Sequence, residues 1–471
     1  MQRSLANPCN PLIRPIRVLT TLQDGSQQPP SKYNGDMNRS LSLPACFLIV
    51  TLTLLLISGC GNKQDERTTL TLWAAPTGGD EKAFKIICDR FEKEHPNIRL
   101  HLVGGLKEEK LVRSIVAGAP PDLAYLYNPV MVGPLAANHA VRPLDDYYRK
   151  SGFKDEDFLP GAIAQMRYEG SIYAMPSGRD SRGFYWNKKV FQENGLHPDR
   201  PPQTLNELFE LAVKLTKKKP NGTLSRLGML PPQDNALFFC AMGGRLYDPN
   251  TRRVTIDIPE NVAALKWRVK LVDAQGGRDA VAGFTSGFGP MESAQNPLAK
   301  GDVAMQIDGE WLAVHLERYA PDAKYGIGEI PHPDDRPDLK NMAWQDGDIL
   351  VMPSGSRHPE AAWEFMRWLQ EPRVQEEYAA RLNNLPTVRA LLDSRRITSG
   401  SPSKETLGYI LKHIAANGAN ARYFPALPVT KLYKDALDNA VQLAELHQKT
   451  PEQALADAQK RVQRELDRYH Q

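Results

Sequence analysis

"TTLTLWAAP" at residues 68–76 and "PDLAYLY" at residues 121–127 frame the segment that decides the fold. Both stretches have the apolar, β-branched and aromatic composition of strands. Between them, "NIRLHLV" at residues 97–103 alternates apolar and polar side chains, which predicts a third strand. The segment therefore predicts three strands in succession.

Two helices are predicted to connect these strands. Apolar side chains recur at helical spacing over residues 80–94, and a second helical stretch over residues 107–117 ends at Gly118. Strand–helix–strand–helix–strand with short connections predicts a parallel sheet with right-handed crossovers. Ligands of such sheets bind beyond the carboxyl ends of the strands, which here means the loops at residues 75–80 and 127–129.

Upstream of this segment, "LLISGC" at residues 55–60 ends an apolar run from Ala45 to Ile57. The run is shorter than the roughly 20 residues of a membrane-spanning helix and fits the apolar core of a secretory signal, with Arg39 in front of it. Ile57-Ser58-Gly59-Cys60 resembles the lipobox of bacterial lipoproteins, which implies cleavage before Cys60 and acylation of that cysteine. The open alternatives are an ordinary signal with a chance cysteine and an uncleaved anchor.

This motif divides the part of the chain that precedes the predicted strands. Residues 37–59 are predicted to be the signal peptide and residues 60–67 a tether, so the mature chain is expected to be an exported lipoprotein facing the periplasm or the cell exterior. Met37 begins a signal of normal length, whereas Met1 would put more than forty residues before the apolar core. Residues 1–36 are interpreted as the product of a misplaced start codon or as a disordered leader.

The charge of the mature chain is close to neutral. Residues 1–59 hold five of the 59 Lys and Arg residues and two of the 55 Asp and Glu residues, so the formal charge falls from +4 to +1. A nearly neutral surface of mixed charge argues against nucleic acid as a partner. About 400 residues exceed one ordinary core, which predicts two lobes.

The cysteines indicate neither redox chemistry nor a metal site. Cys9 and Cys46 lie upstream of the mature chain and Cys60 is the anchor, which leaves Cys88 and Cys240. The sequence has no Cys-x-x-Cys pair and no Cys/His cluster at metal-ligand spacing, so no metal and no cofactor are expected. Cys88 lies on the apolar stripe of a predicted helix, which favours a buried free thiol over a disulfide.

Further elements are predicted along the chain. Strands are expected at residues 172–175, 184–186 and 305–307. Capping boxes at Thr204 and Thr450 predict the starts of two helices.

A series of motifs resembles one family, the extracellular solute-binding proteins of ABC importers, in their maltose- and oligosaccharide-binding branch. In chain order the motifs are Met175-Pro176, "FYWNKKVFQENGL", "PPQTLNEL", "LAKGDVAMQIDGEWLA", "PHPDD", "PSGSRHPEAAWEFMRWL", "NLPT" and "TPEQALADAQKRVQREL". The resemblance runs with gaps from about Leu70 to the carboxyl end. It implies a type II periplasmic-binding fold with two α/β lobes, strands that cross between them, and solute in the cleft.

The resemblance also implies the division into lobes. The first lobe is expected to contain residues 68–177 and 350–389, and the second residues 178–349 and 390–471. Closure about the crossing strands is the expected motion. We expect a monomer that delivers its solute to the permease subunits of an ABC importer.

The family's contact positions carry over to individual residues. They are Thr77, Gly78, Tyr127, Asn128, Asp180, Trp311, Asp346, Gly347, Asp348, Asn384 and Phe424. Trp311 matches an aromatic residue that stacks on a sugar ring, and Asn384 and Phe424 are the weaker matches. "QDGD" at residues 345–348 is more acidic than the paired glycines of many relatives, so the identity of the solute does not transfer.

Chemistry supports a carbohydrate as the solute. Sugar hydroxyls need planar donors and acceptors, and their C–H faces pack on aromatic rings. Each candidate also has a structural interpretation: Trp311 in a helix core, Tyr127 in local packing, Asp180 paired with Arg179 or Arg182, and Asp348 bonded only to backbone. Two further tryptophans, Trp363 and Trp368, are predicted to be core residues of a helix.

Two other functions remain open at this point. A surface-anchored glycoside hydrolase or lyase would need two carboxylates at a defined separation, for which Asp346 with Asp348 or Asp180 with Glu310 are candidates. The sequence lacks the GxSxG, HExxH and P-loop motifs, and we expect no enzymatic activity. The second alternative is a sugar-binding protein that serves a sensor.

Overall fold

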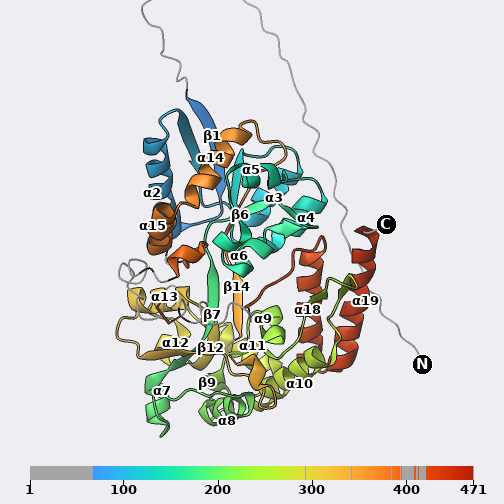
Figure 1. Cartoon of the computed structure of the whole chain (residues 1–471). Coiled ribbons are helices and arrows are strands. Elements are labelled where there is room, and N and C mark those ends of the chain that lie inside the picture. The colour runs from blue at the N-terminus through green and yellow to red at the C-terminus, as the bar shows by residue number, and fades with distance from the viewer. Residues whose placement is uncertain are drawn as a thin grey trace, which may run out of the picture. The chain divides into compact units, whose positions relative to one another are not determined.

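The computed structural model describes most of the chain after residue 66. The described residues are 67–291, 293–340, 342–382, 384–392, 394, 408–409, 412 and 421–469. Cys60, the predicted signal peptide and the leader lie outside them. From Glu66 onward the chain forms one unit, in which two sheets carry separate groups of helices (Figure 1).

The first sheet contains the three strands that were predicted between residues 68 and 127. Its strand order is β2-β1-β3-β15-β6. The strands are β1 (Thr68–Ala74), β2 (Ile98–Val103), β3 (Leu123–Leu126), β6 (Ala174–Pro176) and β15 (Ile349–Val351). β1 pairs in parallel with β2 and β3, as predicted, whereas β15 runs antiparallel to β3 and β6.

Helices cover this sheet and bury its apolar side chains. Figure 1 shows α2 beside α14 and α15, and Phe91 of α2 packs edge-on against Phe365 and Trp368 of α14 at 5.0 and 5.2 Å between ring centres. Trp363 and Trp368 are buried, which confirms the prediction that they belong to the core. The helices are α2 (Gly78–Glu94), α3 (Glu108–Val116), α4 (Val132–Ala137), α5 (Asp145–Lys150), α6 (Pro160–Ala164), α14 (Pro359–Leu369) and α15 (Pro372–Leu382), with short 3-10 turns η1 (Pro129–Met131), η2 (Asp155–Asp157) and η4 (Arg389–Leu391).

The second sheet has the order β16-β14-β7-β12-β9-β8, and β13 also pairs with β7. Its strands are β7 (Asp180–Asn187), β8 (Lys217–Lys218), β9 (Leu224–Met229), β12 (Val303–Gly309), β13 (Tyr325–Gly328), β14 (Ala343–Asp346) and β16 (Ala421–Arg422). Successive side chains of a strand point to opposite faces. Phe184 and Trp186 of β7 accordingly join one apolar cluster, and Tyr185 joins another.

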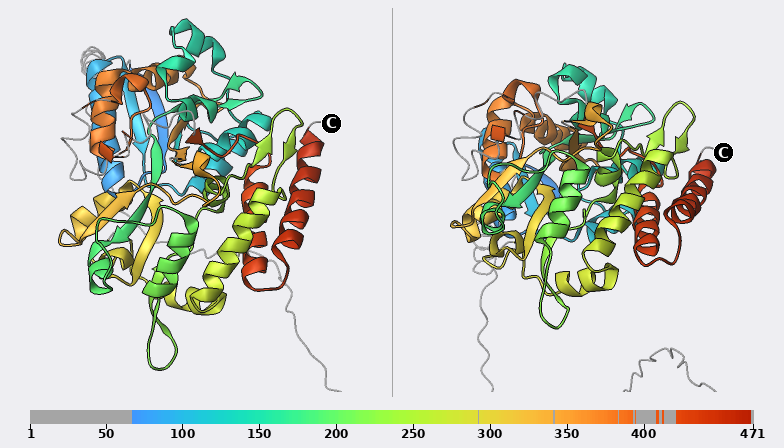
Figure 2. Two further views of the ribbon diagram at one scale, coloured as in Figure 1. Left: turned by 60° about the horizontal axis from the view of Figure 1, so that its bottom comes forward. Right: turned by 90° about the horizontal axis from the view of Figure 1, so that it is seen from below.

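Both faces of the second sheet are covered by helices. Figure 2 shows α10, α18 and α19 side by side, and the apolar side chains of α18 and α19 lie in the same cluster as Phe184. The helices are α7 (Lys188–Glu193), α8 (Leu205–Leu215), α9 (Asn235–Ala241), α10 (Pro259–Ala274), α11 (Arg278–Thr285), α12 (Pro297–Lys300), α13 (Trp311–Tyr319), α18 (Thr430–Glu445) and α19 (Pro451–Tyr469). The remaining small elements are the hairpins β4 (Arg167–Tyr168) with β5 (Ser171–Ile172) and β10 (Tyr247–Asp248) with β11 (Arg253–Val254), and the 3-10 turn η3 (Pro337–Leu339).

Both predicted helix starts form, and the one at Thr450 has a complete capping box, whereas at Thr204 the Glu207 carboxylate accepts the Gln203 N–H instead. The Thr204 hydroxyl accepts the Glu207 N–H at the start of α8. At the start of α19, Thr450 and Gln453 each accept the other's backbone N–H at 3.2 Å. Reciprocal capping satisfies donors that a helix start otherwise leaves open.

Two chain segments cross side by side between the sheets. One leads from β6 to β7 through residues 177–179, and the other leads from β14 to β15 through residues 347–348. The Ser177 N–H donates to the Asp348 carbonyl at 2.9 Å, and the Asp348 N–H donates to the Gly178 carbonyl at 3.1 Å. Gly347 has φ +145°, and a Cβ there would collide with the Gly178 carbonyl oxygen, so the close crossing requires glycine.

These observations confirm the predicted two-lobed α/β fold. The first sheet draws on residues 68–176 and 349–351, and the second on residues 180–346 and 421–422. The residue at which each lobe begins and ends remains a prediction.

The described cysteines confirm the prediction of buried free thiols. Cys88 and Cys240 are buried and unpaired, and burial raises the pKa of both thiols, that of Cys240 to about 12.

Within the described part of the chain, every helix is too short or too polar to cross a bilayer. These same residues hold no group of three or more acidic, histidine or cysteine side chains that could bind a metal ion.

Candidate functional site

The predicted contact residues lie mainly at the carboxyl ends of strands in both sheets. Thr77 and Gly78 follow β1 and are exposed, and Tyr127 and Asn128 follow β3. In the second sheet, Trp311 follows β12 after a single intervening residue. Open α/β sheets bind their ligands at this edge.

A cluster of carboxyl groups occupies the crossing segments. Asp180 begins β7, Asp346 ends β14 and pairs in register with it, and Asp348 follows in the second crossing segment. Glu310 joins them from the residue before α13, where it accepts the Ser181 N–H at 3.1 Å and lies close enough to Asp180 for the two charges to act on each other. We call Asp180, Glu310, Asp346 and Asp348 the hinge carboxyls.

Neutral donors hold two of the hinge carboxyls together. The Asn384 amide donates to Asp180 and to Asp348, at 3.2 Å in each case. Asp348 also accepts the Tyr125 hydroxyl at 2.6 Å, and that hydroxyl lies 2.6 Å from the Tyr378 hydroxyl. Asp348 therefore hydrogen bonds side chains as well as backbone, so the interpretation that it bonds only to backbone is wrong.

Burial and mutual repulsion shift the protonation of this cluster. Burial, followed by the charge of Asp346, raises the pKa of Asp180 to about 6. Burial and then Asp180 raise the pKa of both Glu310 and Asp348 well above the ordinary range. Near neutral pH the cluster therefore retains protons that isolated carboxyls would already have lost.

Arg182 pairs with Asp346 and not with Asp180. Its guanidinium donates to Asp346 at 3.1 Å, and the Trp344 indole N–H reaches the same carboxylate oxygen at 3.3 Å. Burial opposes its charge, but Asp346, Asp180 and Glu310 outweigh that effect and raise the pKa of Arg182. Asp346 is thus the hinge carboxyl with a cationic partner.

Trp311 is partly buried and contacts this ion pair. The Arg182 guanidinium carbon lies 4.3 Å from the centre of a Trp311 ring, a cation–π distance. The ring also lies directly against Gly309, where a Cβ would overlap it. A sugar that stacks on Trp311 would therefore meet Arg182 at the same ring.

Tyr127 projects from the first sheet with 40% of its surface exposed. Its ring meets that of Tyr125 edge-on at 6.0 Å between centres, and its backbone N–H donates to Glu108 at 3.1 Å. Burial raises the pKa of Glu108 to about 7. Asn128 is partly buried, and its carbonyl accepts the Met131 N–H at 3.1 Å.

Phe424 lies in the core and not on an open surface. It is 3% exposed and packs edge-on against Tyr433 at 5.1 Å between ring centres. An aromatic ring that shares a core cluster offers no face to a solute, so we correct the prediction and leave Phe424 out of the proposed site.

The sequence did not point to several residues of this region. Tyr125 and Tyr378 were missed, although Tyr125 lies in the quoted third strand. Glu108 was missed because its link to the site passes through the Tyr127 backbone. Arg182 was considered only as a partner of Asp180.

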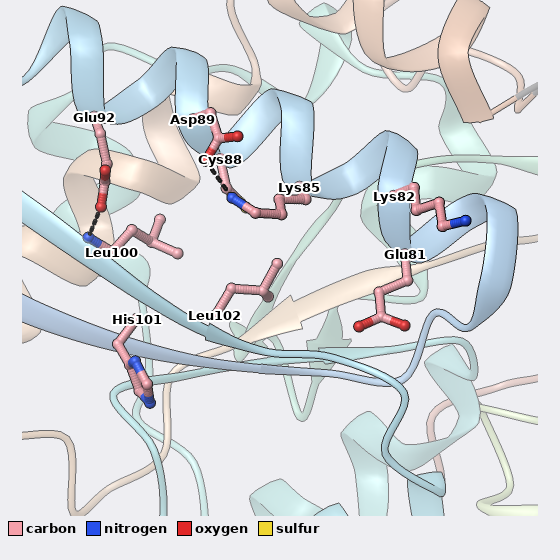
Figure 3. A pocket seen from close by; sticks show the side chains of 9 residues that line it. All are labelled: Glu81, Lys82, Lys85, Cys88, Asp89, Glu92, Leu100, His101 and Leu102. Atoms are coloured by element: carbon pink, nitrogen blue, oxygen red, sulfur yellow. Dashed lines mark hydrogen bonds and ion pairs between the residues drawn. The ribbon is translucent and has the colours of Figure 1, made fainter.

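A separate cavity of about 390 Å³ lies between α2 and β2 (Figure 3). It contains none of the predicted contact residues. Figure 3 shows the Glu92 carboxylate reaching the Leu100 N–H and Lys85 reaching Asp89, the latter at 2.7 Å. This cavity belongs to the outer edge of the first sheet and not to the strand ends.

Comparison with known proteins identifies the family. The family described as bacterial extracellular solute-binding protein matches residues 75–376. The chain is 29% identical to CpMnBP1 with mannobiose bound, with a TM-score of 0.70 over 84% of this chain and 100% of that chain. It is 23% identical over 429 residues to the sn-glycerol-3-phosphate-binding periplasmic protein UgpB of Escherichia coli strain K12, which covers 85% of this chain and 93% of UgpB.

A second structure supports the fold alone. It is an ABC transporter solute-binding protein of Thermotoga lettingae bound with α-D-tagatose, 24% identical, with a TM-score of 0.68 over 85% of this chain and 100% of that chain. The family match spans more than half of the sequence. The chain therefore belongs to the bacterial extracellular solute-binding proteins, which bind solutes outside the cytoplasm.

Proposed function

We propose that this protein captures a sugar or oligosaccharide between its two lobes and delivers it to the permease of an ABC importer. The observation that carries the proposal is the hinge cluster: where the lobes meet, the Asn384 amide donates both to Asp180 of β7 and to Asp348 of the second crossing segment. A solute bound there would contact both lobes and the segments that join them.

The side chains around the hinge fit a polyhydroxylated solute. Carboxylates and the Asn384 amide provide planar groups for hydroxyls, and Trp311 and Tyr127 provide aromatic rings for the C–H faces of a sugar. The similarity to CpMnBP1, which has mannobiose bound, supports the same solute class. We therefore keep all predicted contacts except Phe424 as the proposed site.

Closure about the crossing segments is the proposed motion. Only a few backbone hydrogen bonds join the two segments at residues 177–179 and 347–348, and hinge residues of this kind absorb rotation between domains. Arg179 and Leu385 add a third connection through reciprocal backbone bonds of 3.0 and 2.9 Å. Small-angle scattering of the free and saturated protein tests this motion.

We also propose that the protein is a monomer and that it is attached to the membrane by acyl chains on Cys60. Cleavage before Cys60 would leave the tether between the lipid and β1, and two or more acyl chains give stable membrane attachment where a single one does not. Cys60→Ala should move the protein from the detergent phase to the aqueous phase. Wild-type protein without lipid by mass spectrometry would rule out the anchor.

A carbohydrate-active enzyme is the competing function, and the raised pKa of Asp180 is the observation that favours it. A retaining or inverting glycosidase pairs a protonated carboxyl with an ionised one roughly 5–9.5 Å away. Release of reducing ends from an oligosaccharide would support the enzyme, and intact recovery of the oligosaccharide supports binding.

A thermal-shift panel tests the proposed function directly. The chain from residue 61 onward contains the whole compact unit, and mannobiose is the first probe because CpMnBP1 binds it. A ligand at 100 times its Kd adds about 2.7 kcal/mol to the free energy of unfolding, which raises Tm by several degrees. No shift with any mono- or oligosaccharide would contradict sugar capture. Permease genes beside this one would favour import over a sensor.

A further inference from the structure

We propose that Asn221 is a site of spontaneous deamidation, at which attack by the Gly222 backbone nitrogen converts the side-chain amide to aspartate or isoaspartate. The site lies in the turn between β8 and β9, at the edge of the second sheet. Asn221 and Gly222 are exposed, and Figure 2 shows the hairpin projecting past the neighbouring helices. The inference is independent of the proposed function, because it uses none of the residues of the proposed solute site.

The Asn221 side chain is folded over the peptide bond that follows it. Its Oδ1 accepts the Thr223 N–H at 3.1 Å, an Asx turn that carries the side chain past Gly222. Deamidation requires this placement, because the carboxamide carbon must approach the Gly222 nitrogen to close a five-membered ring. Gly222 has φ +84°, and a Cβ there would meet no atom within 4 Å, so the turn around the attacking nitrogen is open.

Two donors act on the oxygen that gains charge during the attack. The Thr223 hydroxyl donates to the Asn221 Oδ1 at 2.7 Å, in addition to the Thr223 backbone N–H. Attack on the carboxamide turns Oδ1 into an oxyanion, and hydrogen bonds aimed at a developing oxyanion stabilise the transition state. Thr223 alone therefore supplies both donors of an oxyanion site.

The surrounding charge favours loss of the Gly222 amide proton. Positive charge attracts hydroxide and stabilises the nitrogen anion that attacks. The hydrogen bond from the Gly222 N–H to the Lys219 carbonyl, at 2.9 Å, opposes this step. Between Glu210 and Asp234 the chain has no acidic residue and five cationic ones, which are Lys214, Lys217, Lys218, Lys219 and Arg226.

The reaction consumes only water. The Gly222 nitrogen gives its proton to solvent and bonds to the Asn221 Cγ, after which the Cγ–Nδ2 bond breaks and ammonia leaves with a proton from water. Water then opens the resulting succinimide at either carbonyl, which gives aspartate or isoaspartate. Either product adds one negative charge beside the lysines at residues 217–219, and isoaspartate also adds one carbon to the backbone of the turn.

A second Asn-Gly pair provides a matched control. Asn194-Gly195 follows α7, and its glycine N–H donates to a carbonyl three residues back at 3.1 Å, as in the hairpin. The Asn194 amide nitrogen donates to the Val190 carbonyl at 2.7 Å, so the side chain is held back along the helix and its leaving group is bound. Asn194 is also only partly exposed. We therefore expect Asn194 to resist deamidation.

The test incubates the chain from residue 61 onward at pH 8 and follows each Asn-Gly pair by peptide mapping. Mass spectrometry measures the conversion of amide to acid, and an isoaspartate-specific methyltransferase detects the iso form. We expect Asn221 to deamidate at least about tenfold faster than Asn194. Equal rates, or a faster reaction at Asn194, would overturn the proposal. The pair Asn417-Gly418 lies outside the described residues and is mapped separately.

Two variants test the cause. Thr223→Val removes the hydroxyl donor but keeps the backbone N–H and the branched shape, so it should slow deamidation of Asn221 about two- to fivefold, the value of one hydrogen bond. An unchanged rate would contradict stabilisation of the oxyanion by Thr223. Asn221→Gln would require a less favourable six-membered ring, so the acidic species of the hairpin peptide should disappear. Its continued formation at the same rate would place the reaction elsewhere.

Incubation in urea separates the effect of the fold from that of the sequence. Unfolding removes both the Asx turn at Asn221 and the hydrogen bond that holds Asn194 to α7. The ratio of the two rates should therefore fall at least about threefold in urea. If the ratio is the same in urea and in buffer, the fold does not set the reactivity of Asn221 and the proposal is wrong.

Discussion

Asp180→Asn should make the empty protein more stable at neutral pH while it weakens solute binding. The substitution keeps a side-chain oxygen that can accept the Asn384 amide, 3.2 Å from Asp180 in the native chain. It removes a charge that burial and Asp346 disfavour. A functional site that stores electrostatic strain typically gains stability when the strained group is neutralised.

The size of the effect follows from the pKa of Asp180. The folded state raises it from 3.8 to about 6, and each pKa unit corresponds to 1.36 kcal/mol. The folded protein binds more protons than the unfolded chain between these values, so stability falls as pH rises through this window. The full penalty is present above about pH 6 and amounts to about 1–3 kcal/mol, because Glu310 shares protons with Asp180.

Thermal unfolding at two pH values measures this gain. At pH 7.5, Tm of Asp180→Asn should exceed that of wild type by about 1–4 °C, since about 1 kcal/mol shifts a unit of roughly 400 residues by a little over 1 °C. At pH 4 most of this gain should disappear, because wild-type Asp180 is then protonated in the folded protein and close to half protonated in the unfolded chain. Titration with the solute should show a loss of affinity of about tenfold or more, because a hydrogen bond to a charged group is lost.

Asp346→Asn provides the matched control. Asp346 has a cationic partner in Arg182, so its neutralisation should lower Tm at pH 7.5. The reasoning would be refuted if Asp180→Asn lowered Tm at pH 7.5, or if its gain were the same at pH 4 and pH 7.5.

Three further substitutions have distinct expected outcomes. Trp311→Ala should reduce sugar affinity at least tenfold, about 1.4 kcal/mol, by calorimetry; unchanged affinity with a large loss of stability would make Trp311 a core residue. Gly347→Ala should lower Tm through the clash with Gly178, and a Tm within error of wild type would show that the crossing segments separate easily. Phe424→Ala should lower the free energy of unfolding, measured with denaturant, by about 3–5 kcal/mol. If the variant instead lost sugar affinity while keeping its stability, Phe424 would belong to the binding site after all.

Much of the fold was predictable because its signals are local. The spacing of Phe84, Ile87, Cys88 and Phe91 predicted α2, and all four side chains are buried. Capping boxes are contained within four residues, so Thr204 and Thr450 marked their helix starts correctly. The lobe arrangement came from the order of family motifs, since no local pattern states which strands share a sheet.

The site was less predictable because its contacts are long-range. Asp180 and Asn384 are 204 positions apart and Tyr125 and Asp348 are 223 positions apart, so spacing in the sequence could not reveal that they meet. Phe424 looked like a contact residue because aromatic side chains serve both cores and sugar sites. Its packing against Tyr433 depends on where α18 lies, which the sequence around Phe424 does not state.

The central claim is that a saccharide bound at the hinge draws the two lobes together. The most direct measurement is a small-angle scattering titration of the chain from residue 61 onward with the saccharide that gives the largest thermal shift. We predict that the radius of gyration falls and then saturates at the concentration at which calorimetry shows the site to be full. A radius of gyration that stays constant while the calorimetric site fills would contradict capture by closure about the crossing segments.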